Sequence, residues 1–148
     1  MGVNFSALYA YYLASPVNWL IILCPKKFII EFMTILIMVK TGLCGVTFTW
    51  YLDHHFEKKH FVAGVFGIFY ALSGYMAAYS WNIMWLDCIF LLPLILYGLE
   101  QLVQEKKGLF YCVTLGLSIL SNYYISIMIC IFMVMYVIVQ VILYRQRR

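Results

Sequence analysis

The sequence contains very little charge. Charged residues make up 11% of its 148 residues, against about 25% in soluble domains. Hydrophobic residues reach 66%, and the mean hydropathy is +0.92. Polar side chains are too few to cover a soluble core of this size. A chain with this much apolar surface also does not stay disordered, because burial of that surface outweighs the entropy cost of folding. The composition therefore excludes a soluble globular domain and a disordered chain, and it predicts a protein whose solvent is lipid.

Several motifs that carry chemistry are also absent. The sequence has no P-loop, no Ser–His–Asp arrangement and no H-E-x-x-H motif. It has no basic stretch interleaved with aromatic residues, so we expect no nucleic acid partner. The five cysteines are isolated, without a C-x-x-C pair, which argues against a disulfide framework or a metal site. Segment 53–60 holds three histidines and two acids, which favours a solvated loop over a metal site. We therefore expect no metal ligands there; the cofactor stays unknown, with a divalent cation left open.

Long hydrophobic runs dominate what is present. Because a membrane-spanning helix needs about 20 apolar residues, the runs predict an all-α, polytopic transmembrane helical bundle of about five spans, with residues 1–148 as a single transmembrane region. Residues 1–27 are expected to form an outer interfacial segment, since their apolar part stops at Pro25 before it can span. Within this segment, Ser15-Pro-Val-Asn18 predicts a turn or the start of a helix. The expected spans are residues 28–52, 61–80, 88–103, 109–123 and 125–144.

The distribution of basic residues predicts an orientation. The loops after the first and third spans, together with the tail after the fifth, hold seven basic residues, whereas the N-terminal flank holds two. The positive-inside rule then places the protein in the cell membrane with its N-terminus outside and its C-terminus cytoplasmic. No cleavable signal peptide opens the chain. We therefore expect a further span upstream, with this chain as the interior of a longer membrane protein.

Aromatic residues gather on the predicted outer side, which carries ten of the seventeen Tyr and Trp residues. One interpretation is an aromatic belt at the lipid headgroups. The other is an outward-facing groove, because flat rings stack on sugars and line paths for lipid tails. In the second interpretation, the candidate substrate-binding rings are Tyr75, Trp81, Trp85, Tyr123 and Tyr124.

Four polar residues are further candidates. Asp87, where the outer loop meets the third span, is either a helix-start residue or a metal ligand, general base or cation clamp. We favour function and take it as the catalytic candidate, since a carboxylate there is costly unless paired. Lys40, about 18 Å along the first span, either snorkels toward the cytoplasm or binds a phosphate or a carboxylate on another helix. For Asn122 we favour a role in a turn over substrate binding. Asn82 is a further candidate for substrate binding.

Several segments, taken in their order along the chain, also form a recognisable set of sequence motifs. These are Tyr11–Asn18, Cys24–Lys26, Glu31 with Lys40–Gly42, Tyr70–Tyr75, Asn82–Asp87, Pro93–Glu100 and Ser121–Tyr124. In this order they resemble the YfhO family of bacterial membrane proteins, and the resemblance covers nearly the whole chain.

The resemblance implies a function. Members of the family are much longer and are similar to GT-C glycosyltransferases. Those enzymes move a sugar from a polyprenyl-phosphate carrier to a cell-envelope polymer such as teichoic or lipoteichoic acid. It implies an enzyme for the full-length member, with this chain as part of a larger GT-C-like membrane domain. The implied partners are membrane lipids, the polyprenyl-phosphate-linked sugar and the envelope polymer.

Activity of this chain alone is not expected. In the GT-C class the key acidic residue usually lies in the first outer loop, and nothing here matches that segment. Two alternatives stay open. One is a component of a membrane transporter or permease. A transporter would need more polar residues deep in several spans and a second, similar half, and the sequence shows neither. The other is a non-catalytic accessory membrane subunit.

Overall fold

The computed structural model of the protein describes residues 15–56 and 61–146. These residues form helices and no strand, which confirms the predicted all-α class. Residues 1–14 of the expected interfacial segment, and residues 57–60 of the loop with three histidines, lie outside the described ranges. The elements are η2 (Asn18–Leu23), η3 (Lys26–Phe28), α2 (Ile29–His55), α3 (Phe61–Ala71), α4 (Gly74–Tyr79), α5 (Ile83–Glu105), α6 (Leu109–Ser121) and α7 (Tyr123–Gln146).

Within residues 15–56 and 61–146, four helical stretches are long and apolar enough to cross a membrane. They are Lys26–His55, Phe61–Tyr79, Ile83–Glu105 and Tyr123–Ile142. The fifth apolar helix, α6, has 13 residues and is therefore about 20 Å long. This is shorter than the hydrocarbon core of about 30 Å, so α6 alone does not cross it upright.

Two helices differ from the expected spans. The run 61–80 is interrupted at Ser73, whose backbone is extended (φ −63°, ψ 157°), and it forms the two helices α3 and α4. A Ser–Gly pair is a weak helix former, which accounts for the break. The third span was expected from residue 88, but α5 begins at Ile83, directly after Asn82 at its N-cap position. Asp87 therefore lies in the second turn of α5.

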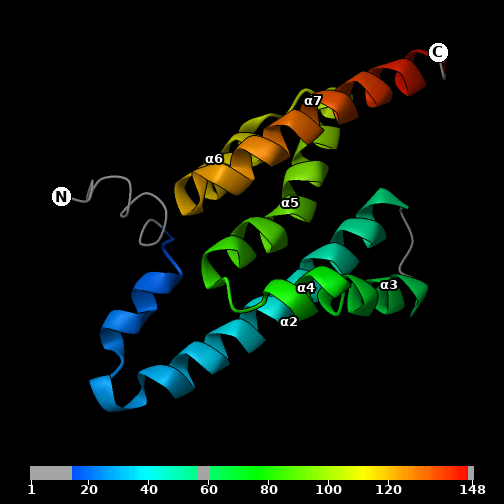
Figure 1. The fold of residues 1–148 in the computed structure, drawn as a ribbon. Helices are drawn as coiled ribbons and strands as arrows, with labels where there is room; N and C mark the ends of the chain where they lie inside the picture. Colours follow the sequence, from blue (N-terminus) through cyan, green and yellow to red (C-terminus); the bar gives the residue numbers. More distant parts are fainter. Residues whose placement is uncertain (1–14, 57–60, 147–148) are drawn as a thin grey trace.

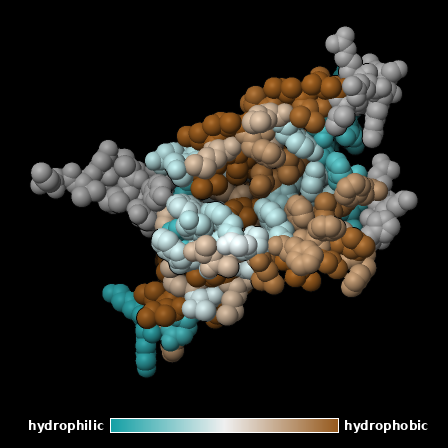
Figure 2. Space-filling view, turned by 45° about the vertical axis from the view of Figure 1, so that its right-hand side comes forward, coloured by the Kyte–Doolittle hydropathy of each residue, from teal (hydrophilic) through white to brown (hydrophobic). Residues whose placement is uncertain are grey.

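Helix α5 lies in the middle of the bundle (Figure 1), with α2 against one side of it and α6 and α7 against the other. More than half of its apolar stretch, 56%, is buried within the chain, against 17–22% for the other three stretches. Helix α3 packs on α2. The outward faces of these helices carry exposed apolar side chains, and Figure 2 shows hydrophobic side chains over much of the surface. Such faces suit contact with lipid.

Glycines allow two pairs of helices to approach closely. A Cβ atom on Gly67 of α3 would lie 2.0 Å from Oγ1 of Thr49 and 2.7 Å from the carbonyl oxygen of Gly45, both on α2. A Cβ atom on Gly98 of α5 would lie 2.9 Å from the backbone of Tyr111 on α6. Small residues at such crossings let backbones pack in the way that membrane helices use.

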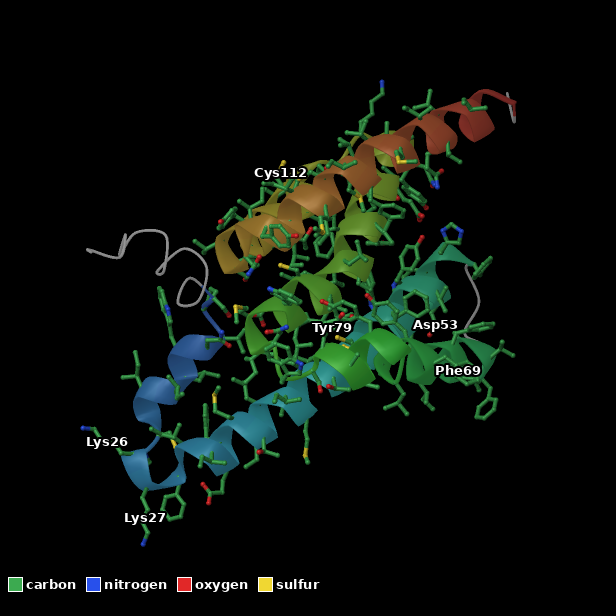
Figure 3. All side chains as sticks on the ribbon, viewed as in Figure 1. Lys26, Lys27, Asp53, Phe69, Tyr79 and Cys112 are labelled. Atoms are coloured by element: carbon green, nitrogen blue, oxygen red, sulfur yellow. The ribbon has the colours of Figure 1, made fainter. Side chains whose placement is uncertain are left out.

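The helices give the bundle two ends. At the Asp87 end, the start of α5 meets the end of α6 and the start of α7, since Cys88 lies against Asn122 and Ser126. At the Glu100 end, the C-terminal part of α5 meets the end of α2 and the middle of α7. Lys26 and Lys27 point away from the bundle where α2 begins, and Asp53 lies near the other end of α2 (Figure 3).

Candidate functional site

The centre of the candidate site is a buried ion pair between α2 and α5. The Nζ atom of Lys40 lies 2.8 Å from Oδ1 of Asp87. Both residues have 0% of their surface exposed. Two opposite charges in direct contact, removed from water and lipid, neutralise each other, which is the condition under which such groups are tolerated in a membrane protein.

The remaining polar atoms of the pair are satisfied locally. Nζ of Lys40 also donates hydrogen bonds to Oδ1 of Asn18 at 2.7 Å and to the carbonyl oxygen of Ile83 at 3.1 Å. The third polar contact of the ammonium group is the ion pair itself, because Oδ1 of Asp87 meets Nζ at 2.8 Å without hydrogen-bond geometry. The hydroxyl of Ser15 donates a hydrogen bond to Oδ2 of Asp87. We refer to Lys40, Asp87, Ser15 and Asn18 together as the ion-pair cluster.

The structure excludes one of the alternatives for each charged residue. Asp87 lies in the second turn of α5, and the N-cap position belongs to Asn82, so the helix-start interpretation of Asp87 is wrong. Lys40 does not snorkel, because its side chain is fully buried. It pairs with a carboxylate on another helix, which was one of the alternatives for this residue.

A turn brings Ser15 and Asn18 to the pair. The amide N–H of Asn18 donates to the carbonyl oxygen of Ser15 at 3.1 Å and contacts its hydroxyl oxygen at 3.3 Å. The turn predicted for this segment is thereby confirmed. Pro16 at its second position presets the backbone torsion that such a turn needs. Both side chains reach the ion pair, which attaches the segment before α2 to α2 and α5.

A row of aromatic residues precedes Asp87 of the ion-pair cluster in the sequence. The rings of Tyr75 and Tyr79 on α4 have centroids 5.3 Å apart, and the ring of Tyr79 lies 6.1 Å from that of Trp85 on α5. The indole Nε1 of Trp85 is buried and has no hydrogen-bond partner among the described residues. Trp81 is 68% exposed, and its Nε1 donates to the carbonyl oxygen of Ala78. Figure 3 labels Tyr79, the middle ring of this row.

Asn122 lies in a polar seam between α5, α6 and α7. Its Oδ1 accepts the backbone N–H of Ile125 at 3.1 Å, so it caps the start of α7 as a turn residue does. Its carbonyl oxygen lies 3.7 Å from Sγ of Cys88, the neighbour of Asp87. Tyr123 and Tyr124 lie at the same turn and are about half exposed. Of the predicted site residues, the structure brings Lys40 and Asp87 into contact. Asn82, Trp85 and Asn122 lie near the same Asp87 end of the bundle. The side chains of Trp81, Tyr123 and Tyr124 are exposed.

Two cavities within the described ranges lie away from the residues of the predicted outer groove. One, of about 620 Å³, lies between α2 and α3 and is lined by small and apolar residues such as Gly45 and Gly67. The other, of about 330 Å³, lies between α6 and α7. No candidate site residue lines either cavity. Within the described ranges, no three His, Cys, Asp or Glu side chains are placed to hold a metal ion.

A second buried polar cluster, at the Glu100 end, was not predicted. Oε1 of Glu100 accepts hydrogen bonds from the hydroxyls of Tyr51 at 2.8 Å and Tyr136 at 2.6 Å. Nδ1 of His55 lies 3.0 Å from the same carboxylate, and Gln140 donates to Tyr136. Glu100 therefore joins α2, α5 and α7. Two signals could have identified the cluster: an acid at the end of an apolar run, and tyrosines four residues before a second polar side chain on the same helix face.

Comparison with known proteins identifies a family. The model of a family described as bacterial membrane protein YfhO matches residues 1–148, the whole length of the chain. No curated protein and no solved structure matches the sequence.

Proposed function

The chain belongs to the YfhO family of bacterial membrane proteins, and from this premise we propose that it is part of a membrane glycosyltransferase. The enzyme takes a sugar from a polyprenyl-phosphate carrier and adds it to a cell-envelope polymer, in the manner of the GT-C enzymes to which members of the family are similar. The chain itself is an integral membrane protein, and its described residues include four apolar helical stretches of spanning length.

The buried ion pair is the observation that carries this proposal. Lys40 and Asp87 bring a cation and a carboxylate together at the end of the bundle that holds the rings of Tyr75, Tyr79 and Trp85. Ionisable residues within a membrane are expensive and mark functional sites by default. A lipid-linked sugar phosphate presents three matching features: an anionic phosphate, a flat apolar sugar face and a long apolar tail.

Each group then has a defined task in the proposed transfer. A hydroxyl oxygen of the polymer forms a bond to the anomeric carbon of the sugar, and the bond from that carbon to the phosphate oxygen breaks. The leaving polyprenyl phosphate keeps the electron pair, and Lys40 neutralises its charge. Asp87 accepts the proton of the attacking hydroxyl. The aromatic rings stack on the sugar. The exposed apolar faces of the helices contact the polyprenyl tail of the carrier within the lipid.

A purely structural ion pair would explain the same contacts, so the test must separate the two roles. Asp87→Asn alone leaves the charge of Lys40 buried and unpaired, which lowers stability as well as activity. The double variant Lys40→Met with Asp87→Asn removes both charges together and keeps the size of both side chains. We expect this variant to reach the membrane at near wild-type level and to lose transfer of sugar.

The assay measures transfer of a tritiated hexose from polyprenyl phosphate to envelope polymer, in membranes that contain the full-length protein, normalised to its amount. The control is the double variant Glu105→Gln with Lys107→Met, which removes an exposed pair at the other end of the bundle. Normal transfer by the Lys40/Asp87 variant would return the pair to a structural role and contradict the proposal.

We further propose that the Asp87 end faces the outside, because the basic loops belong to the opposite end. A single cysteine introduced at Tyr124 should then react with an impermeant maleimide on intact cells, whereas one introduced at Lys106 should react only after the cells are opened. For this test the native Cys24, Cys112 and Cys130, which are not buried, are replaced by alanine. The reverse labelling pattern would refute this orientation.

A further inference from the structure

We propose that Ser15 and Asn18 form a strap over the ion pair, and that each side chain occupies the position of a group of the substrate. Ser15 stands where a hydroxyl binds to Asp87, and Asn18 stands where a phosphate oxygen binds to Lys40. The inference rests on the proposed function and deepens it, since it makes this conformation a closed one that a polyprenyl phosphate must open.

The hydrogen bonds of the strap have the chemistry of the proposed substrate. Ser15 donates an alcohol O–H to Oδ2 of Asp87, as the attacking hydroxyl of a polymer would. Asn18 offers an amide oxygen to the ammonium of Lys40 at 2.7 Å, as a phosphate oxygen would. A phosphate carries full negative charge, so it is the stronger acceptor for a buried ammonium.

The strap is the replaceable part of the cluster. Two of the three acceptors around Lys40, namely Asp87 and the carbonyl oxygen of Ile83, belong to α5 and are held by that helix. The third, Asn18, begins the short 3₁₀ helix η2. A ligand that approaches Lys40 can therefore replace Asn18 without unwinding a long helix.

Among the described residues, those that follow Asn18 bury little apolar surface. Leu20 is 49% exposed and Ile22 is 80% exposed. Segments that bury few apolar side chains open at low free-energy cost. Because the backbone of Asn18 is hydrogen-bonded to Ser15, the two side chains leave together, and their departure exposes both charges at once.

Binding of farnesyl phosphate, a short polyprenyl phosphate, tests the strap directly. The full chain is placed in lipid nanodiscs and binding is followed by tryptophan fluorescence, with farnesol as the ligand that lacks the phosphate. Ser15→Ala and Asn18→Ala each remove a hydrogen bond that binding must break. Since a hydrogen bond to a charged group corresponds to a factor of roughly ten in affinity, each variant should bind farnesyl phosphate about tenfold more tightly than wild type.

Two further variants make the sign of the effect decisive. Asn18→Asp gives the strap a negative charge next to Lys40, so it should bind farnesyl phosphate more weakly than wild type. Ser80→Ala is the matched control, because Ser80 lies between Tyr79 and Trp81 and has no hydrogen bond to Lys40 or Asp87. Its affinity should equal that of wild type.

The possible outcomes separate the strap from the enzymatic role. Unchanged or weaker binding by both alanine variants would overturn the strap, the latter because it would make Ser15 and Asn18 ligands of the substrate. Equal binding of farnesyl phosphate and farnesol by every variant would also overturn it. If the alanine variants bind more tightly while the wild-type full-length protein transfers no sugar, the strap stands and the glycosyltransferase proposal falls.

Discussion

The ion pair of Lys40 and Asp87 makes a quantitative prediction about stability. At an effective dielectric constant of 20, two unit charges at the observed 2.8 Å attract each other by about 6 kcal/mol. The desolvation cost of both charges offsets much of this attraction, so the intact pair contributes little net stability. Loss of one partner is different, because the other charge stays buried without compensation, at a cost of about 3–5 kcal/mol.

A double-mutant cycle measures this coupling. We expect Lys40→Met and Asp87→Asn each to lower the free energy of unfolding by about 3–5 kcal/mol. The double variant should lose far less than the sum, because it leaves no unpaired charge. The assay is unfolding of the purified protein by SDS in mixed micelles, followed by circular dichroism. A coupling free energy of at least about 2 kcal/mol is the expected result.

The exposed pair of Lys107 and Glu105 is the control for this cycle. It has the same 2.8 Å separation, but its side chains are 74% and 50% exposed. Water screens such a pair, so the cycle Lys107→Met with Glu105→Gln should give a coupling below about 1 kcal/mol. Additive effects at Lys40 and Asp87, as small in coupling as those of the control, would refute the view that burial makes the pair interdependent.

Two predictions concern the packing around α5. Gly98→Ala places a methyl group 2.9 Å from the backbone of Tyr111 and should destabilise the bundle by about 1–3 kcal/mol in the same SDS titration. The control Gly116→Ala, at a position with open space around it, should leave stability unchanged. Equal effects of the two variants would contradict the close approach of α5 and α6. Glu100→Gln removes the negative charge of the group that accepts hydrogen bonds from two tyrosine hydroxyls, and it should lower the free energy of unfolding by about 1–3 kcal/mol. A decrease below about 0.5 kcal/mol, typical of exposed positions, would show that the cluster at the Glu100 end does not hold the helices together.

The sequence by itself determined the solvent of the protein and its helices. Apolar runs of spanning length, with charged residues confined mostly to short breaks between them, leave helices as the structure that satisfies the backbone in lipid. The turn at Ser15–Asn18 was also local, because proline restricts its own backbone and that of the residue before it. The interruption at Ser73 and the early start of α5 at Ile83 were missed, since hydropathy does not mark helix ends.

Only the tertiary structure decided which charges meet. Lys40 and Asp87 lie 47 positions apart on different helices, and their spacing along the chain contains no information about the angle at which α2 crosses α5. That crossing is set by packing, in which Cys44 of α2 and Leu86 of α5 lie in one buried cluster. The same crossing brings Tyr51 to Glu100 at the other end. Sequence indicates which residues are costly to bury; the packing of the helices supplies the partners that make their burial tolerable.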